Sequence, residues 1–169
     1  MKMMMSNELS DYYFLTALKA ANNAELTKAI CHAAVSMGIN RENDECRKLA
    51  GLCYYKLGNY IMAEYCFNNS SYYLDKIKDL LSEKKKLLDD IGQLVNNRQY
   101  KKAIRVLEEE KDKSVNEYNY LGCLYAAVCK HKKAAACFME ALKADSTNEE
   151  ALYYLKNIQI IKEKRWWNI

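Results

Sequence analysis

The sequence reads Leu49-Ala50-Gly51-Leu52-Cys53-Tyr54-Tyr55-Lys56-Leu57-Gly58-Asn59-Tyr60 from residue 49, and Ala63 and Phe67 follow shortly after. Large residues recur every three or four positions as far as Leu57, which is typical of an amphipathic helix. Gly58 predicts a tight turn, because glycine adopts the left-handed backbone conformation that ends many helices. The stretch therefore predicts two helices joined by a short turn.

A second copy of this pattern lies further along the chain. Its matching residues are Tyr118, Leu121-Gly122, Tyr125, Ala134, Phe138 and Ala141-Leu142. In each copy, a glycine in the first helix and an alanine in the second leave little side chain between them, so the helices can approach closely. We expect Phe67 and Phe138 to fill the contact with the next helix pair.

The two copies resemble the tetratricopeptide repeat (TPR), a helix–turn–helix unit of about 34 residues. The resemblance covers residues 44–77 and 115–148, and weaker copies occupy residues 10–43 and 84–114. The family normally places a proline at the end of the second helix, and this chain has none. Residues 149–164 show the periodicity of one more amphipathic helix, which we expect to cap the last unit.

The spacing of the units is uneven. The alanines at the matching place in each second helix are Ala29, Ala63, Ala103 and Ala134, at intervals of 34, 40 and 31 residues. We expect the long interval to extend a helix through residues 76–86 and the short one to tighten the turn at 111–114. Thr147 and Glu150 have the spacing of a capping box at the start of the final helix.

The resemblance implies an all-α fold, a single domain over residues 1–169. About four TPR-like helix pairs would stack into a right-handed superhelix that ends in the capping helix. The first helix of each pair lines a concave groove in this family, and members hold peptides or other proteins there. The implied function is a non-catalytic scaffold or adaptor that binds a peptide or helix of a partner. The implied groove residues are Phe14, Leu18, Lys48, Leu52, Tyr55, Asn119 and Tyr120.

One subset of the family clamps the acidic tails of heat-shock chaperones with Lys and Asn side chains on successive first helices. Here Phe14 and Leu18 stand at the corresponding positions of the first unit, and Lys48 of the second unit is not accompanied by an Asn. A single Lys cannot hold two carboxylates in the way such a clamp requires. We therefore expect no binding of chaperone tails.

Composition limits the remaining classes of function. The chain has 169 residues, 50% of them hydrophobic, which excludes a disordered protein. With only 5 Gly and no Pro, it has no Gly-rich phosphate-binding loop and does not favour a loop-rich β fold. It shows neither a secretory signal nor an apolar stretch of membrane-spanning length, so we expect a cytoplasmic protein.

The reactive side chains predict neither catalysis nor a metal site. The 7 cysteines include no Cys-x-x-Cys pair, and we expect them to be small buried hydrophobes. Two histidines, His32 and His131, are too few and too scattered for a zinc site. We therefore expect no enzyme activity, no metal and no cofactor.

Two alternatives to groove binding remain open. A basic edge would gather on two neighbouring turns and bind an acidic protein segment or phosphate backbones, although solvated charge is the simpler interpretation and nucleic acid is not favoured. Its residues are Arg98, Lys101, Lys102, Arg105, Lys130, Lys132 and Lys133. Alternatively, the chain self-assembles into a homo-oligomer through its apolar ends and the tail that contains Trp166 and Trp167.

Overall fold

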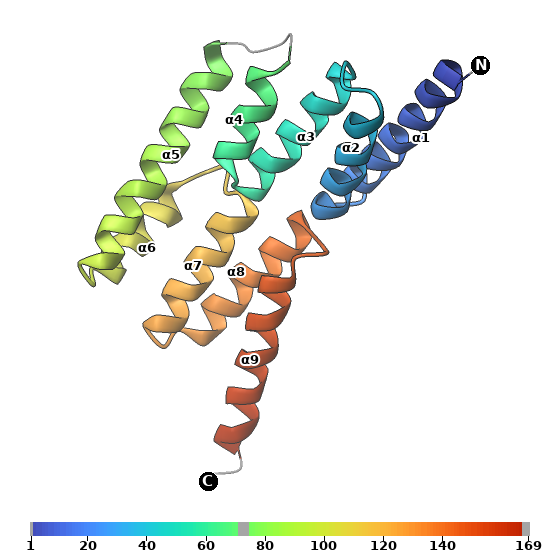
Figure 1. Ribbon diagram of the computed structural model, residues 1–169. Coiled ribbons are helices and arrows are strands. Elements are labelled where there is room, and N and C mark those ends of the chain that lie inside the picture. Colours follow the sequence, from blue (N-terminus) through green and yellow to red (C-terminus); the bar gives the residue numbers. More distant parts are fainter. Residues whose placement is uncertain (1, 71–74, 167–169) are drawn as a thin grey trace. The chain divides into compact units, whose positions relative to one another are not determined.

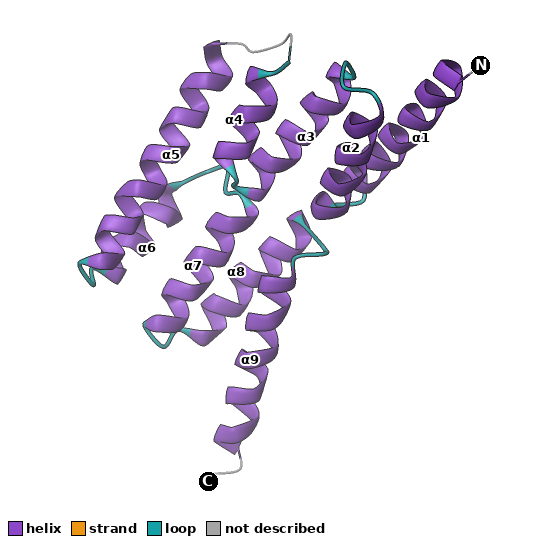
Figure 2. Ribbon diagram, in the orientation of Figure 1, coloured by secondary structure: helices purple, strands orange, loops and turns teal. Residues whose placement is uncertain are grey.

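The computed structural model describes the backbone of residues 2–70 and 75–166, and the side chains of residues 7–70 and 77–158. Within these ranges every regular element is a helix, and short turns join the helices (Figures 1 and 2). This confirms the all-α prediction. The helices are α1 (Lys2–Asn22), α2 (Leu26–Ile39), α3 (Asp44–Leu57), α4 (Tyr60–Asn68), α5 (Asp75–Asn96), α6 (Tyr100–Glu109), α7 (Val115–Ala127), α8 (His131–Ala144) and α9 (Glu149–Trp166).

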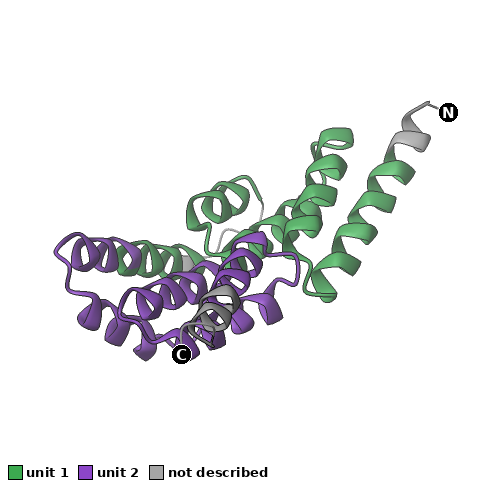
Figure 3. Ribbon diagram, turned by 90° about the horizontal axis from the view of Figure 1, so that it is seen from below, with its two compact units in different colours: residues 1–87 green, residues 88–169 purple. Residues whose placement is uncertain are grey.

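The chain divides into two compact units, residues 1–87 and 88–169 (Figure 3). In the first unit, α2 packs against both α1 and α3, and α3 packs against α4. Small buried side chains form its core, which brings the helix backbones close together. These residues are Ala17, Ala33, Cys46, Ala50 and Cys66.

A buried polar cluster ties together the first three helices. The hydroxyl groups of Ser10 and Ser36 are 3.0 Å apart, and the Ser36 hydroxyl donates to the Ser10 carbonyl at 2.9 Å. The Asn43 amide nitrogen lies 3.4 Å from both hydroxyls, and its oxygen caps α3 by accepting from the Cys46 N–H. The cluster thus satisfies polar groups that would be costly to bury alone.

The second unit contains the last part of α5 and helices α6 to α9. Helix α7 packs against α6 and α8, and α8 packs against α9. Leu107, Val115 and Phe138 are among its fully buried side chains. The observed bounds of α9 confirm the predicted final helix and extend it by two residues.

The glycine of each strong repeat copy lies against the phenylalanine of the same helix pair. A Cβ atom on Gly51 would lie 2.8 Å from the Phe67 ring, and one on Gly122 would lie 2.7 Å from the Phe138 ring. The predicted close approach of the helices is therefore confirmed. Phe138 also stacks on Tyr154 of the next helix, with ring centroids 4.9 Å apart.

Four turns repeat one backbone geometry. Ala24, Gly58, Arg98 and Cys129 each have a positive φ, between 55° and 89°. Each lies two residues before the first residue of the second helix of a pair. The left-handed residue therefore reverses the chain in the same way in all four turns. Only Gly58 adopts this conformation without steric cost, so the turns at Ala24, Arg98 and Cys129 are less ideal.

The uneven spacing has two physical causes. Helix α5 has 22 residues and runs through the predicted extension at 76–86. Helix α6 has only 10 residues, against 14 in α2 and α8, so a short helix contributes to the short interval.

The capping-box prediction at Thr147 was wrong. Asn148 caps α9 by accepting from the Ala151 N–H at 2.8 Å, while the Thr147 hydroxyl donates to Asp145. A capping box is instead formed by Ser114 and Glu117 at the start of α7. Asn148 is the better cap because its side chain lies one residue before the helix begins.

Candidate partner-binding surfaces

The predicted groove residues of the first unit are partly open. Leu18 on α1 and Leu52 on α3 are 38% and 51% exposed, and these two helices contact each other. Phe14 packs against the core, and Tyr55 packs against Tyr60 with ring centroids 5.6 Å apart, so both are half-buried.

Lys48, the only cation among the predicted groove residues, is held by its own helix. Its Nζ lies 2.7 Å from Glu45 and 3.4 Å from Asp44. These contacts raise the pKa of Lys48, chiefly through the hydrogen bond to Glu45. The surrounding carboxylates neutralise its charge, so it offers little attraction for an acidic partner.

Helix α1 carries an apolar stripe that sequence periodicity had not singled out. Leu9, Tyr12, Leu15 and Leu18 recur every third residue, so each is a surface neighbour of the next, and all four are exposed. The i, i+3 spacing is visible in the sequence, but of these four residues only Leu18 was predicted to line the groove. We call these four residues the α1 stripe.

The second unit buries one predicted groove residue. Asn119 is 2% exposed, and its amide donates to Asn148 at 3.0 Å and to Glu150 at 3.2 Å. It therefore connects α7 to α9 and is not open to a partner, which corrects its assignment to the groove. Its neighbour Tyr120 is 37% exposed.

A second polar contact joins the same two helices. Cys123 of α7 hydrogen-bonds to Tyr154 of α9, and this bond is the main cause that raises the pKa of Tyr154 to about 12. Burial is the main cause that raises the pKa of the Cys123 thiol. Helix α9 is thus attached to α7 by side-chain contacts as well as to α8 by packing.

All seven residues predicted for the basic edge are exposed: Arg98, Lys101, Lys102, Arg105, Lys130, Lys132 and Lys133. The turns that carry them lie at the same end of the second unit (Figure 1). Lys133 is different, because its Nζ lies 3.6 Å from Glu108, 3.4 Å from the Tyr125 hydroxyl and 5.1 Å from the centre of the Tyr125 ring.

Glu108, Tyr125 and Lys133 form one connected group. The Tyr125 hydroxyl donates to Glu108. This hydrogen bond is the main cause that holds the pKa of Glu108 below its ordinary value, and the Lys133 charge adds to it. Lys133 therefore joins α8 to α6 and α7, and the remaining six residues define the basic edge from here on.

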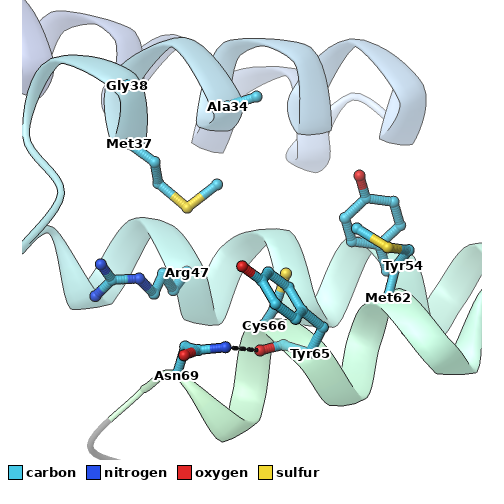
Figure 4. Close-up of a pocket in the computed structure, with 9 residues that line it drawn as sticks. All are labelled: Ala34, Met37, Gly38, Arg47, Tyr54, Met62, Tyr65, Cys66 and Asn69. Carbon is cyan, nitrogen blue, oxygen red and sulfur yellow. Dashed lines mark hydrogen bonds between the residues drawn. The ribbon is translucent and has the colours of Figure 1, made fainter.

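A pocket of about 480 Å³ opens in the first unit between α2, α3 and α4. Figure 4 shows Met37 reaching from α2 toward Arg47 and Tyr54 on α3 and Met62, Tyr65 and Cys66 on α4. Sequence reasoning missed this pocket. The composition of α4 could have indicated it. This helix has apolar residues on nearly all sides, and such a helix usually has more than one face covered by other groups.

The cysteines are divided between core and surface. Burial raises the pKa of the Cys46, Cys66 and Cys137 thiols, so they remain protonated and poorly nucleophilic near neutral pH. Cys31 and Cys129 are exposed, which corrects the expectation that the cysteines are buried. Among the side chains that the structure describes, no group of three or more His, Cys, Asp or Glu is arranged to hold a metal ion.

No model of a known protein family matches the sequence, and no curated protein is detectably similar to it. None of the helices within the described residues is long and apolar enough to cross a bilayer. Trp166 ends α9, but its side chain and all of Trp167 lie outside the described residues.

Proposed function

We propose that this protein is a TPR-like, non-catalytic adaptor that binds a segment of a partner protein along the first helices of its repeats. Two features of the fold support the repeat assignment. One turn geometry recurs at Ala24, Gly58, Arg98 and Cys129, and the glycine–phenylalanine contact recurs in two helix pairs. Stacking of such pairs would produce the right-handed superhelix implied by the resemblance.

The observation that carries the function is the exposed apolar surface on the first helices of the first unit. Tyr12 is 63% exposed, and with Leu15, Leu18 and Leu52 it offers aliphatic and aromatic area on α1 and α3. Contiguous apolar patches on a protein surface are typical of interaction sites. Tyrosine adds a hydrogen-bonding tip to a large contact area, which suits peptide recognition.

The test compares partner recovery by two double variants that each add two negative charges. Leu15→Glu with Leu52→Glu changes the proposed surface, while Leu152→Glu with Tyr153→Glu changes exposed apolar residues of α9 in the second unit. Each purified protein is immobilised, and partners retained from native extract are quantified by mass spectrometry.

We expect the first double variant to lose at least about tenfold in recovery of the main partner, because a charge buried against an apolar ligand is costly. The second should retain that partner at the wild-type level. Circular dichroism checks that both variants are folded. A folded Leu15→Glu, Leu52→Glu protein with undiminished recovery would refute groove binding.

The basic edge supports a second, electrostatic candidate function: capture of an acidic protein segment. Its six exposed cations lie in the turns before α6 and α8 and in the first two turns of these helices, at one end of the second unit. Such binding would weaken steeply as salt rises, whereas groove binding through apolar contacts would not. Partner recovery measured from 50 mM to 500 mM salt on the same column distinguishes groove binding from binding at the basic edge. Over this range the electrostatic screening length falls from roughly 14 Å to about 4 Å.

A further inference from the structure

The pocket between α2, α3 and α4 lies on a different side of α3 from the proposed groove. Arg47 and Tyr54 are seven residues apart and therefore share one face of the helix, whereas Tyr55 projects roughly 90° and Leu52 roughly 150° around the axis from them. A ligand in the pocket would thus contact a surface that the groove leaves free. The pocket requires an explanation of its own.

The two ends of the pocket differ in chemistry. Arg47, at the start of α3, and Asn69, just after the end of α4, lie at one end, while Tyr54 and Met62 lie at the other (Figure 4). Arg47 and Tyr54 are separated by two helical turns, or about 10 Å along the axis. A ligand that fills the pocket must therefore combine a polar and an apolar group at this distance.

Arg47 determines the sign of the polar group. It is half-buried, and it is the one charged residue among the described residues that line the pocket. Across residues 7–70 and 77–158, no carboxylate forms an ion pair with it. A guanidinium favours a carboxylate, which it can bind through two parallel hydrogen bonds.

The rest of the pocket selects an apolar side chain. Met37 and Met62 have flexible, polarisable side chains that adapt to ligands of different shape. Tyr54 and the more exposed Tyr65 add aromatic surface, and Cys66 closes the pocket with a buried thiol. None of the lining residues that the structure describes carries a negative charge that would oppose an acidic ligand.

We propose that this pocket is a second docking site, which takes a peptide segment of a partner with an Asp or Glu carboxylate on Arg47 and an aliphatic or aromatic side chain between Tyr54 and Met62. The site extends the proposed adaptor function to a surface that the TPR resemblance does not assign. It depends on no residue of the α1 stripe or of the groove.

The first experiment observes the pocket directly. The intact chain is labelled with ¹³C at the methionine methyl groups, and Met37 and Met62 report on the pocket while Met139 of α8 serves as an internal control. The probe is the peptide Ac-Gly-Asp-Ala-Ala-Phe-Gly-NH₂, whose Asp and Phe are about 10 Å apart when extended. Matched peptides carry Asn or Lys in place of Asp.

We expect the Asp peptide to shift the Met37 and Met62 signals in a saturable manner and to leave Met139 unchanged. The Asn and Lys peptides should bind at least about tenfold more weakly, since they lose the charge-assisted contact. Equal shifts with all three peptides, or no shift at millimolar Asp peptide, would overturn the proposal. Signals that move with protein concentration alone would place a second copy of the chain in the pocket and would also overturn it.

The second experiment changes the cation. Arg47→Glu should reverse the order of the peptides, so that the Lys peptide binds best, and Arg47→Gln should remove the preference for Asp. Arg41→Glu makes the same charge change on an exposed turn residue outside the pocket lining and should keep the wild-type order. If the reversed-charge variant does not fold, Arg47→Gln still decides, because a retained preference for Asp contradicts the role of Arg47.

The same titration on Leu15→Glu, Leu52→Glu separates this site from the groove. We expect the pocket to bind the Asp peptide with unchanged affinity in that variant. Loss of partner recovery with intact peptide binding would leave both proposals standing. Loss of partner recovery in that variant, with no peptide binding by the wild type, would refute only the pocket. Undiminished partner recovery in that variant, with intact peptide binding, would refute only the groove.

Discussion

The contact between a glycine and a phenylalanine ring sets how closely two helices of a pair approach. A Cβ atom at 2.8 Å from the Phe67 ring or 2.7 Å from the Phe138 ring is nearer than real Cβ contacts allow. Because both rings are buried, they have little room to move aside. The glycines are therefore required for space and not for backbone conformation.

Two sets of glycines should therefore respond in opposite ways to substitution by alanine. Gly51→Ala and Gly122→Ala should each lower the free energy of unfolding by about 1–3 kcal/mol through overpacking. Gly38→Ala and Gly92→Ala, where a Cβ would meet nothing within 4 Å, should raise it by about 0.5–1 kcal/mol because alanine favours the helix. Urea unfolding of the four variants measures both signs. Similar destabilisation of all four would show that the rings do not impose the constraint.

The group formed by Glu108, Tyr125 and Lys133 predicts a dependence on pH. The folded protein holds the pKa of Glu108 below its ordinary value of 4.5, mainly through the Tyr125 hydroxyl. Its contribution to stability is therefore complete above the ordinary value and is lost as pH falls through the lowered pKa.

Tyr125→Phe removes the hydroxyl and keeps the buried ring. We expect it to cost about 1 kcal/mol at pH 7, a value kept small because the Glu108 carboxylate is half-exposed. The gap between wild type and variant should narrow as the pH is lowered from 5 to about 3. Denaturant unfolding of both proteins at these pH values measures the gap. A gap that is constant with pH would mean that the hydroxyl does not act through Glu108.

The N-caps of the second helices in two pairs, α4 and α6, allow a matched comparison. Asn59 and Gln99 each occupy the N-cap position, directly before the first residue of the helix. Their backbone angles are similar, with φ and ψ of −92° and 76° at Asn59 and of −86° and 49° at Gln99. The Asn59 side chain accepts from the Met62 N–H at 3.1 Å, whereas Gln99 makes no side-chain cap. The longer Gln side chain is a poor cap at this position.

Exchanging the two residue types should therefore have opposite effects. Gln99→Asn is expected to stabilise the protein by about 0.5–1 kcal/mol, and Asn59→Gln to destabilise it by about the same amount. Both positions are exposed, so neither change disturbs the core. Thermal unfolding of the two variants and of the double variant, which should lie close to wild type, checks this. Stabilisation absent from Gln99→Asn would indicate that its turn cannot accept the cap.

Elements were predictable from the sequence where small residues and turns recur at fixed spacing. Gly51, Gly58 and Gly122 mark the helix pairs because their physical roles permit few other residues. The pocket was not predictable, because the sequence periodicity is the same whether Met62 is exposed or buried. The buried position of Asn119 was not predictable either. Asn119 is buried because Asn148 and Glu150, about 30 residues away, accept its hydrogen bonds, and sequence spacing does not reveal such partners.

For the protein as a whole, the continuity of α5 determines how cooperatively the chain is expected to unfold. The helix continues through the boundary between the two compact units, with 13 residues before it and 9 after. Helices of this length are marginal on their own, because the first turn costs more conformational entropy than it returns. Each part of α5 would therefore be marginally stable as an isolated helix.

This continuity predicts that residues 1–169 unfold as one domain. A calorimetric scan should show a single transition, and Gly51→Ala in the first unit and Gly122→Ala in the second should each move that whole transition to lower temperature. Separate chains of residues 1–87 and 88–169 should melt lower than the intact protein, because each loses the continuation of α5. Two transitions, of which Gly51→Ala shifts only one, would instead show that the units fold independently and that α5 acts only as a linker. The two variants differ only in the unit they destabilise, so the comparison tests the coupling itself and not the overall stability of the protein.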